Sequence, residues 1–136
     1  MSAVVSPIIL NMKLKDSLYT ICRQATDETN IQYEIRLDGT HLIYQAHFPN
    51  EPITPGVCII QIAKELMEDH LHQSLELKVV KNVKFLSVIS PLETPCVTYT
   101  FDKTTPIEET NEWKAQVMVS SDKEALAKLS FVCKAC

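Results

Sequence analysis

Apolar and polar side chains alternate along three runs in the second half of the chain, and this alternation limits the fold more than any other feature. The runs cover residues 97–102, 113–120 and 125–134. A period of two is typical of strands with one buried face. The polar stretches Thr104–Pro106 and Ser120–Lys123 are the expected turns, and short turns between strands favour antiparallel neighbours.

The first half adds further predicted strands. Residues 18–25 and 31–37 carry strand-like patterns, and a long β-branched stretch follows over residues 77–89, closed by Ser90 and Pro91. The chain is therefore expected to form a curved, largely antiparallel sheet of about five to seven strands.

The segment from Val57 to about Leu71 does not fit a period of two. Its polar residues recur at intervals of three and four: Gln61, Lys64, Glu65 and Glu68. This spacing places them on one stripe of a helix whose remaining face is apolar. Thr54 is the expected N-cap and Pro55 the first helical residue. We predict an α+β fold in a single domain, residues 1–136, in which one long helix covers a face of the sheet.

Composition limits the classes of partner and the cellular compartment that are expected for this chain. A net charge of −4, with acidic residues spread along the chain, argues against nucleic acid as the main partner. No window reaches the roughly eighteen apolar residues of a membrane span, and no basic region of a secretory signal precedes the short apolar run near the N-terminus. The five cysteines form an odd set without metal-like pairing, which indicates reduced thiols in a cytoplasmic protein and argues against a metal site. No cofactor is expected.

The segment with the most chemical information is HFPNEPITPGV, residues 47–57. Its three prolines stiffen the backbone between His47 and the first amides of the predicted helix. Those amides have no partner inside the helix, and at Gly56 no side chain shields them from a carbonyl oxygen. An imidazole near such a donor can remove a proton next to a bound carbonyl. A rigid surface loop with an ordinary histidine is the alternative interpretation.

This segment, followed by an apolar helix, resembles the motif H-F-P-x-x-P-[IV]-x-P-G-V-x-x-x-E of the β-hydroxyacyl-acyl-carrier-protein dehydratases. The resemblance implies the hotdog fold, in which a curved antiparallel sheet wraps a long central helix. It also implies protomers joined edge to edge, with the acyl chain in a tunnel at their interface. A homodimer or larger homo-oligomer, or a heterodimer with a paralogue, is therefore expected.

The resemblance also assigns roles to individual residues. His47 is expected to abstract the α-proton of a 3-hydroxyacyl thioester, while the Gly56 amide holds the thioester carbonyl. The expected substrate-binding residues are Phe48, Pro55, Val57 and Cys58. For Cys58 two further interpretations stand side by side: a small core residue among apolar neighbours, or a thiol whose pKa is lowered by the helix dipole.

The chain departs from the motif at the acid. The family carries a carboxylic acid fourteen residues after the histidine, on the central helix of the partner protomer, and the equivalent position here is Gln61, which has no acidic proton. Glu65 follows one turn later, where the family often carries glutamine, so the two residue types look exchanged. Their Cβ atoms are about 5 to 6 Å apart, so Glu65 reaches the site only through a shifted pocket or a bridging water. A solvated polar stripe is the alternative interpretation.

Three hypotheses follow. The first is a dehydratase-like enzyme that converts a 3-hydroxyacyl thioester, carried by acyl carrier protein or coenzyme A, into the trans-2-enoyl thioester in fatty-acid, polyene or polyketide-type synthesis. The second is a non-catalytic acyl-binding partner that has lost the acid and pairs with a catalytic paralogue. The third is a hotdog thioesterase.

Overall fold

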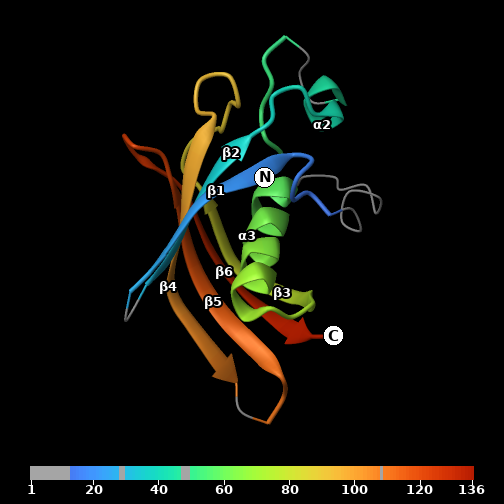
Figure 1. Cartoon of the computed structure of the whole chain (residues 1–136), viewed down its shortest axis with the longest axis vertical. Coiled ribbons are helices and arrows are strands. Elements are labelled where there is room, and N and C mark those ends of the chain that lie inside the picture. Colours follow the sequence, from blue (N-terminus) through green and yellow to red (C-terminus); the bar gives the residue numbers. More distant parts are fainter. Residues whose placement is uncertain (1–12, 28–29, 47–49, 108) are drawn as a thin grey trace.

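The computed structural model describes residues 13–27, 30–46, 50–107 and 109–136. In these ranges the elements are β1 Tyr19–Thr26, β2 Ile31–Leu37, α2 Leu42–Ala46, α3 Gly56–Leu71, β3 Leu75–Phe85, β4 Cys96–Ile107, β5 Glu112–Ser120 and β6 Ala125–Ala135. The six strands described form one sheet in the order β1-β2-β4-β5-β6-β3, and all neighbours are antiparallel. The sheet curves around α3 (Figure 1), which confirms the predicted α+β architecture.

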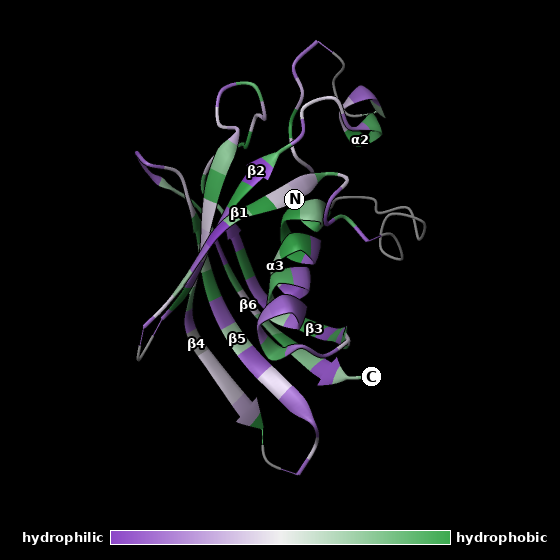
Figure 2. Cartoon of the chain, in the orientation of Figure 1, coloured by the Kyte–Doolittle hydropathy of each residue, from purple (hydrophilic) through white to green (hydrophobic). Residues whose placement is uncertain are grey.

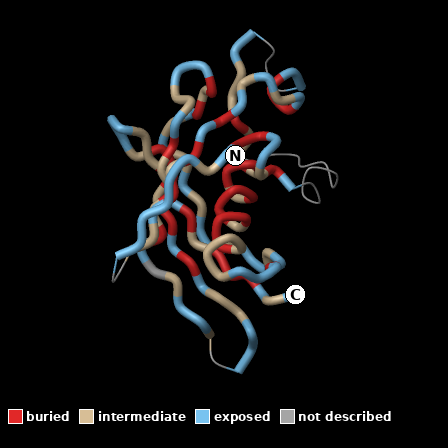
Figure 3. The backbone as a smooth tube through the Cα atoms, viewed as in Figure 1, coloured by how far each residue is buried: buried red, intermediate tan, exposed pale blue. Residues whose placement is uncertain are grey.

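The core lies between α3 and the inner face of the sheet. In β5, for example, Ala115, Val117 and Val119 are buried, while Lys114 and Gln116 face outward. Apolar residues follow the same inner surface along α3 and the neighbouring strands (Figures 2 and 3). Each large apolar side chain buried there contributes about 1.5–3 kcal/mol, so alternation in the strands and the apolar face of the helix together fix how the two layers meet.

The expected turn at Thr104–Pro106 is wrong, because β4 continues to Ile107. Its partner β2 pairs with it only as far as Phe101, and the remainder of β4 pairs with β5 alone. Pro106 lies in that remainder, opposite Trp113. Proline lacks a backbone donor and is tolerated on a strand that has a neighbour on one side only.

The strand expected over residues 77–89 is shifted toward the N-terminus and shortened, since β3 covers Leu75–Phe85. Its register against β6 slips twice, between Leu77 and Val79 and between Val80 and Asn82. The partly buried positions that pack on the core are consequently three, three and two residues apart, at residues 77, 80, 83 and 85. A bulged strand of this kind does not display the period of two from which strands are predicted.

The chain between β2 and the main helix contains α2, a five-residue helix that the sequence did not predict. It buries Ile43 and Tyr44 while Leu42 stays exposed. A search of the described residues for a helix of the length and hydrophobicity that a membrane span requires finds none.

Candidate active site

The start of α3 presents two backbone donors. Pro55 is the N-cap residue, with an extended backbone at φ −61° and ψ 144°. Its carbonyl accepts hydrogen bonds from the amides of Cys58 at 2.9 Å and Ile59 at 3.2 Å. Among the described residues the amides of Gly56 and Val57 have no partner. They lie at the positive end of a 16-residue helix, where they can hold a carbonyl oxygen.

The helix begins one residue after Pro55, and Thr54 does not cap it, so both expectations are wrong. Its hydroxyl lies 2.9 Å from the hydroxyl of Tyr44 in a buried contact, and its amide donates to the Ile89 carbonyl at 2.8 Å. Burial raises the pKa of Tyr44 to about 12, so the phenol stays neutral. The two bonds fasten the residues before the helix to α2 on one side and to the loop after β3 on the other.

Phe85, the last residue of β3, lies against the Cα atom of Gly56. A Cβ atom at Gly56 would approach the ring to 2.6 Å at Cζ and 2.9 Å at Cε2. Gly56 does not have a positive φ, so its backbone conformation does not require glycine. The absence of a side chain at residue 56 therefore makes room for the ring. No pattern in the sequence indicates this contact, because the two residues come from different elements.

Four donors converge on the carboxylate of Glu65. The backbone amides of Leu14 and Lys15 donate at 2.8 Å each, to Oε2 and Oε1, and the Tyr19 hydroxyl donates to Oε1 at 3.0 Å. Gln61 Nε2 donates to Oε2 at 2.8 Å. Glu65 is 3% exposed and Gln61 6%, so the interpretation of these two as a solvated stripe is wrong. The segment that precedes β1 covers them.

This arrangement fixes the orientation of Gln61. A carboxylate only accepts hydrogen bonds, so Gln61 must turn its NH₂ group toward Glu65 and keep its Oε1 atom as an acceptor for another group. Burial and the charge of Glu65 raise the pKa of Tyr19 far above its ordinary value, which keeps Tyr19 a donor. The side chains at positions 61 and 65 thus form one hydrogen-bonded pair across a helical turn.

A second carboxylate extends the same attachment one turn further along α3. The Tyr33 hydroxyl donates to Asp69 Oδ2 at 2.7 Å, and Lys15 Nζ lies 3.4 Å from Asp69 Oδ1. Burial and the hydrogen bond to Asp69 raise the pKa of Tyr33. Through these contacts α3 holds both the segment before β1 and the strand β2, which fixes its position on the sheet.

Cys58 is fully buried in the first turn of α3. Burial, together with the charge of Glu65, raises the pKa of its thiol to about 11. The interpretation as a thiol activated by the helix dipole is therefore wrong, and the small core residue is the correct one. Pro55 and Val57 are only half-buried, and they lie on either side of the buried Gly56.

His47 and Phe48 lie outside the described residues, and their predicted roles stay predictions. Among the residues that the structure describes, no three histidine, cysteine, aspartate or glutamate side chains are grouped so that they could hold a metal ion. Cys133 is buried and Cys136 exposed, and both are free thiols.

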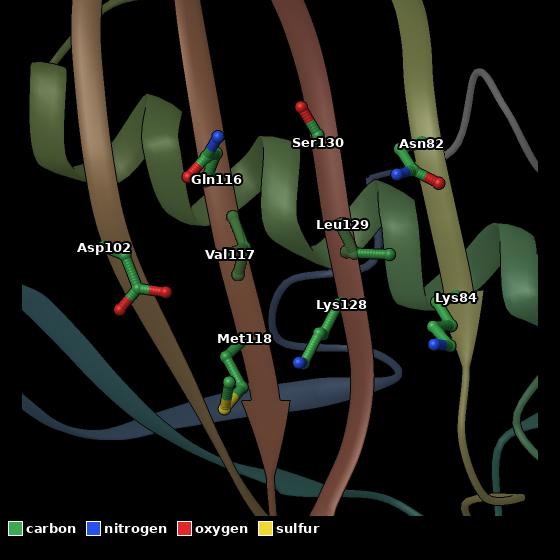
Figure 4. A pocket seen from close by; sticks show the side chains of 9 residues that line it. All are labelled: Asn82, Lys84, Asp102, Gln116, Val117, Met118, Lys128, Leu129 and Ser130. Carbon is green, nitrogen blue, oxygen red and sulfur yellow. The ribbon is translucent and has the colours of Figure 1, made fainter.

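A groove of about 300 Å³ lies on the outer face of the sheet, with α3 behind the strands that form it (Figure 4). Lys84, Lys128 and Asp102 are among the polar side chains that line it. None of the predicted site residues that the structure describes borders this groove, so the candidate site remains the start of α3.

Comparison with known families gives one match that covers most of the chain. The model of a family described as ApeI-like, ApeI dehydratase, matches residues 23–128, a range that includes the whole of segment 47–57. A comparison with curated protein sequences gives no significant match.

Solved structures show the same architecture at low sequence identity. The dehydratase heterocomplex ApeI:P of Xenorhabdus doucetiae has a TM-score of 0.64 and 17% identity, over 85% of this chain and 96% of that one. The virulence protein Cj0977 of Campylobacter jejuni also has a TM-score of 0.64, at 6% identity over 93% and 88% of the two chains. The thioesterase HI1161 of Haemophilus influenzae gives 0.60 and 12%, over 88% and 80%. The predicted hotdog fold is confirmed.

Proposed function

Since the chain belongs to the ApeI-like dehydratase family, we propose that it removes water from a 3-hydroxyacyl thioester to give the trans-2-enoyl thioester. The observation that carries this proposal is that the amides of Gly56 and Val57 have no hydrogen-bond partner among the described residues. They lie at the positive end of α3, inside the segment that resembles the dehydratase motif. Donors placed in this way stabilise the negative charge that develops on a thioester carbonyl when its α-proton leaves.

The proton steps are assigned as follows. His47 takes the α-proton, and the amide of Gly56 holds the carbonyl oxygen while the enolate forms. The carbon–oxygen bond at C3 then breaks, and the proton from His47 leaves with the hydroxyl group as water. Gln61 of a second copy accepts a hydrogen bond from that hydroxyl through Oε1, because its NH₂ group is engaged by Glu65. Gln61 therefore orients the leaving group without supplying a proton.

The proposed substrate is carried as a thioester of acyl carrier protein or coenzyme A, and the proposed assembly joins two or more copies. In the sheet described here β3 is one edge, and its Val79 side chain is 45% exposed. An exposed edge strand offers unpaired backbone groups to a neighbouring chain. We place the contact between copies at this edge.

The test uses purified protein and enoyl thioesters of increasing chain length, beginning with crotonyl thioesters. Hydration is followed by the loss of the conjugated double bond, and thiol release is followed separately with the protein's own cysteines subtracted. Hydration without thiol release supports a dehydratase. Thiol release without hydration contradicts it and supports the thioesterase that the Haemophilus influenzae neighbour suggests.

A non-catalytic acyl-binding partner is the second candidate. It is favoured by Gln61, which lies where the dehydratase motif has its acid, and by the neighbour that is described as a heterocomplex. The exchange of Gln61→Glu together with Glu65→Gln keeps these two side chains hydrogen-bonded to each other and moves the acid to the motif position. It also takes an acceptor from the other donors that Glu65 holds, so circular dichroism must show that the double variant is folded. General acid catalysis is typically worth about 10²–10⁴ in rate. If the wild type is inactive and the double variant is active, the chain is a partner protein that has lost its acid.

A further inference from the structure

The ring of Phe85 packs closely against the Cα atom of Gly56. The ring occupies the position that a side chain at residue 56 would take, with its Cζ atom 2.6 Å from the place of a Cβ atom. Gly56 itself is buried, and Phe85 is only partly buried. One side of the first helical residue is thus closed by the ring.

The backbone that carries the ring is held in place. Leu86 and Ser87 follow Phe85 in the chain, and their amides both donate to the Leu126 carbonyl, at 2.9 and 3.3 Å. Phe85 itself is paired with Ala127, which is fully buried in β6. The ring therefore meets the helix from a fixed strand end, and the helix start cannot move toward β3 without a collision.

The other sides of the helix start are fixed by hydrogen bonds. Thr54 is bonded to Ile89 and Tyr44, and the Tyr99 hydroxyl donates to the Ile59 carbonyl at 2.9 Å from the sheet below. The ring is the apolar member of this frame, and its atoms are the nearest to the place of a Cβ atom at Gly56. Amide donors stabilise a developing charge only when they are already aimed at it, and a misplacement of about 1 Å costs roughly a hundredfold in rate.

We propose that Phe85 is a positioning residue for the Gly56 amide: the ring holds the first turn of α3 so that this amide points at the carbonyl oxygen of the bound thioester. The proposal rests on the proposed function. It adds a residue on a strand outside the motif segment, and it explains why residue 56 is glycine although its backbone conformation does not demand one.

The test exploits the fact that the chain has two glycines, Gly39 and Gly56. Protein labelled with ¹⁵N at glycine gives two amide resonances, which a Gly39→Ala variant assigns. The probe is a 3-hydroxybutyryl or crotonyl thioester of coenzyme A, added to wild type and to Phe85→Leu. Turnover of both proteins is measured in parallel, with kcat and KM separated. Leu77→Ala, which truncates another partly buried side chain of β3, serves as the matched control for lost packing.

In wild type the thioester is expected to shift the Gly56 resonance and leave that of Gly39 in place. In Phe85→Leu we expect a weaker Gly56 response and a kcat lower by about tenfold to a hundredfold, with a smaller change in KM. Leu77→Ala is expected to lose stability and keep both the Gly56 response and kcat. Gly56→Ala is expected to lower both kcat and stability, because the added methyl group collides with the Phe85 ring. The double variant Gly56→Ala with Phe85→Leu is expected to regain part of that stability.

The possible failures are separable. If wild type responds to the thioester and Phe85→Leu matches it in both the Gly56 shift and kcat, the positioning role is overturned while the proposed function stands. If wild type shows neither turnover nor a Gly56 response, the proposed function fails and the positioning role fails with it.

Discussion

At Glu65 one carboxylate satisfies donors from three separate parts of the chain: the segment before β1, the strand β1, and α3 itself. The helical spacing of Gln61 and Glu65 was readable from the sequence, and so was their position on one face. Their burial was not, because the residues that cover them lie about fifty positions earlier in the chain. Spacing within a helix does not show which distant segment packs on it.

Glu65→Gln is therefore expected to destabilise the protein strongly. The amide retains one acceptor oxygen and turns an NH₂ group toward groups that also donate, so at least one buried donor loses its partner. We expect a loss of about 3 kcal/mol in the free energy of unfolding, measured by urea denaturation.

Glu68→Gln on the same helix is the control. Glu68 accepts one backbone hydrogen bond, from Leu75, and pairs with Lys64 in a partly exposed position. Its replacement is expected to cost about 1 kcal/mol or less. If the two variants lose equal free energies of unfolding, the four hydrogen bonds to Glu65 stabilise the protein no more than the contacts of Glu68 do.

The cysteines give a second prediction at the residue scale. Cys22, Cys96 and Cys136 are exposed, whereas Cys58 and Cys133 are buried. Burial raises the pKa of Cys58 to about 11 and that of Cys133 to about 12, from an ordinary value of 9.0. At pH 8 a chromogenic disulfide reagent should react rapidly with three thiols and reach the other two only in denaturant. Five rapid thiols would contradict the burial.

The same shifts set an alkaline limit to stability. A thiol whose pKa is raised in the folded state binds its proton more tightly there, so its stabilising effect is complete below pH 9 and is lost as the pH rises through about 11. Cys58→Ala removes one such group, and unfolding free energies measured between pH 8 and 11 should fall less steeply in this variant than in wild type. The same slope in both proteins would rule out a contribution from Cys58.

Among the elements, α3 and the long strands β5 and β6 were the most predictable, because a helical or strand-like period runs through most of each one. β3 and β4 were harder to predict. Bulges shift the register of β3, and the end of β4 has a neighbour on one side only, which allows Pro106 there. The start of α3 was predicted within a residue or two, but the role of Thr54 was not. Threonine before a helix suggests a cap, whereas its hydroxyl here has a better-placed partner in Tyr44.

The contact between Tyr44 and Thr54 joins α2 to the residues before α3, and a double-mutant cycle measures it. Tyr44→Phe and Thr54→Val each leave one buried hydroxyl without its partner, so we expect each to cost about 1–2 kcal/mol. The double variant should cost less than the sum, by about 1 kcal/mol, since neither hydroxyl is then left unpaired. Strict additivity of the unfolding free energies would show that the two hydroxyl groups do not stabilise each other.

For the whole molecule, the hotdog architecture was predictable because the motif segment, the apolar helix and the alternating strands all indicate the same fold. The structure adds what holds that fold together around the site: the carboxylates of α3 fasten the N-terminal side of the sheet, and Phe85 closes the helix start. The contact of Phe85 with Gly56 joins positions 29 residues apart in sequence, and no local pattern marks it.

The central claim is that segment 47–57 and the start of α3 form a site for proton abstraction from an acyl thioester. Its most direct test compares wild type with His47→Ala in the hydration of an enoyl thioester, with circular dichroism confirming that both proteins are folded. We predict that wild type hydrates the substrate and that His47→Ala loses activity by about 10²-fold or more, as expected when a general base is removed. Equal hydration rates in the two proteins would contradict the account.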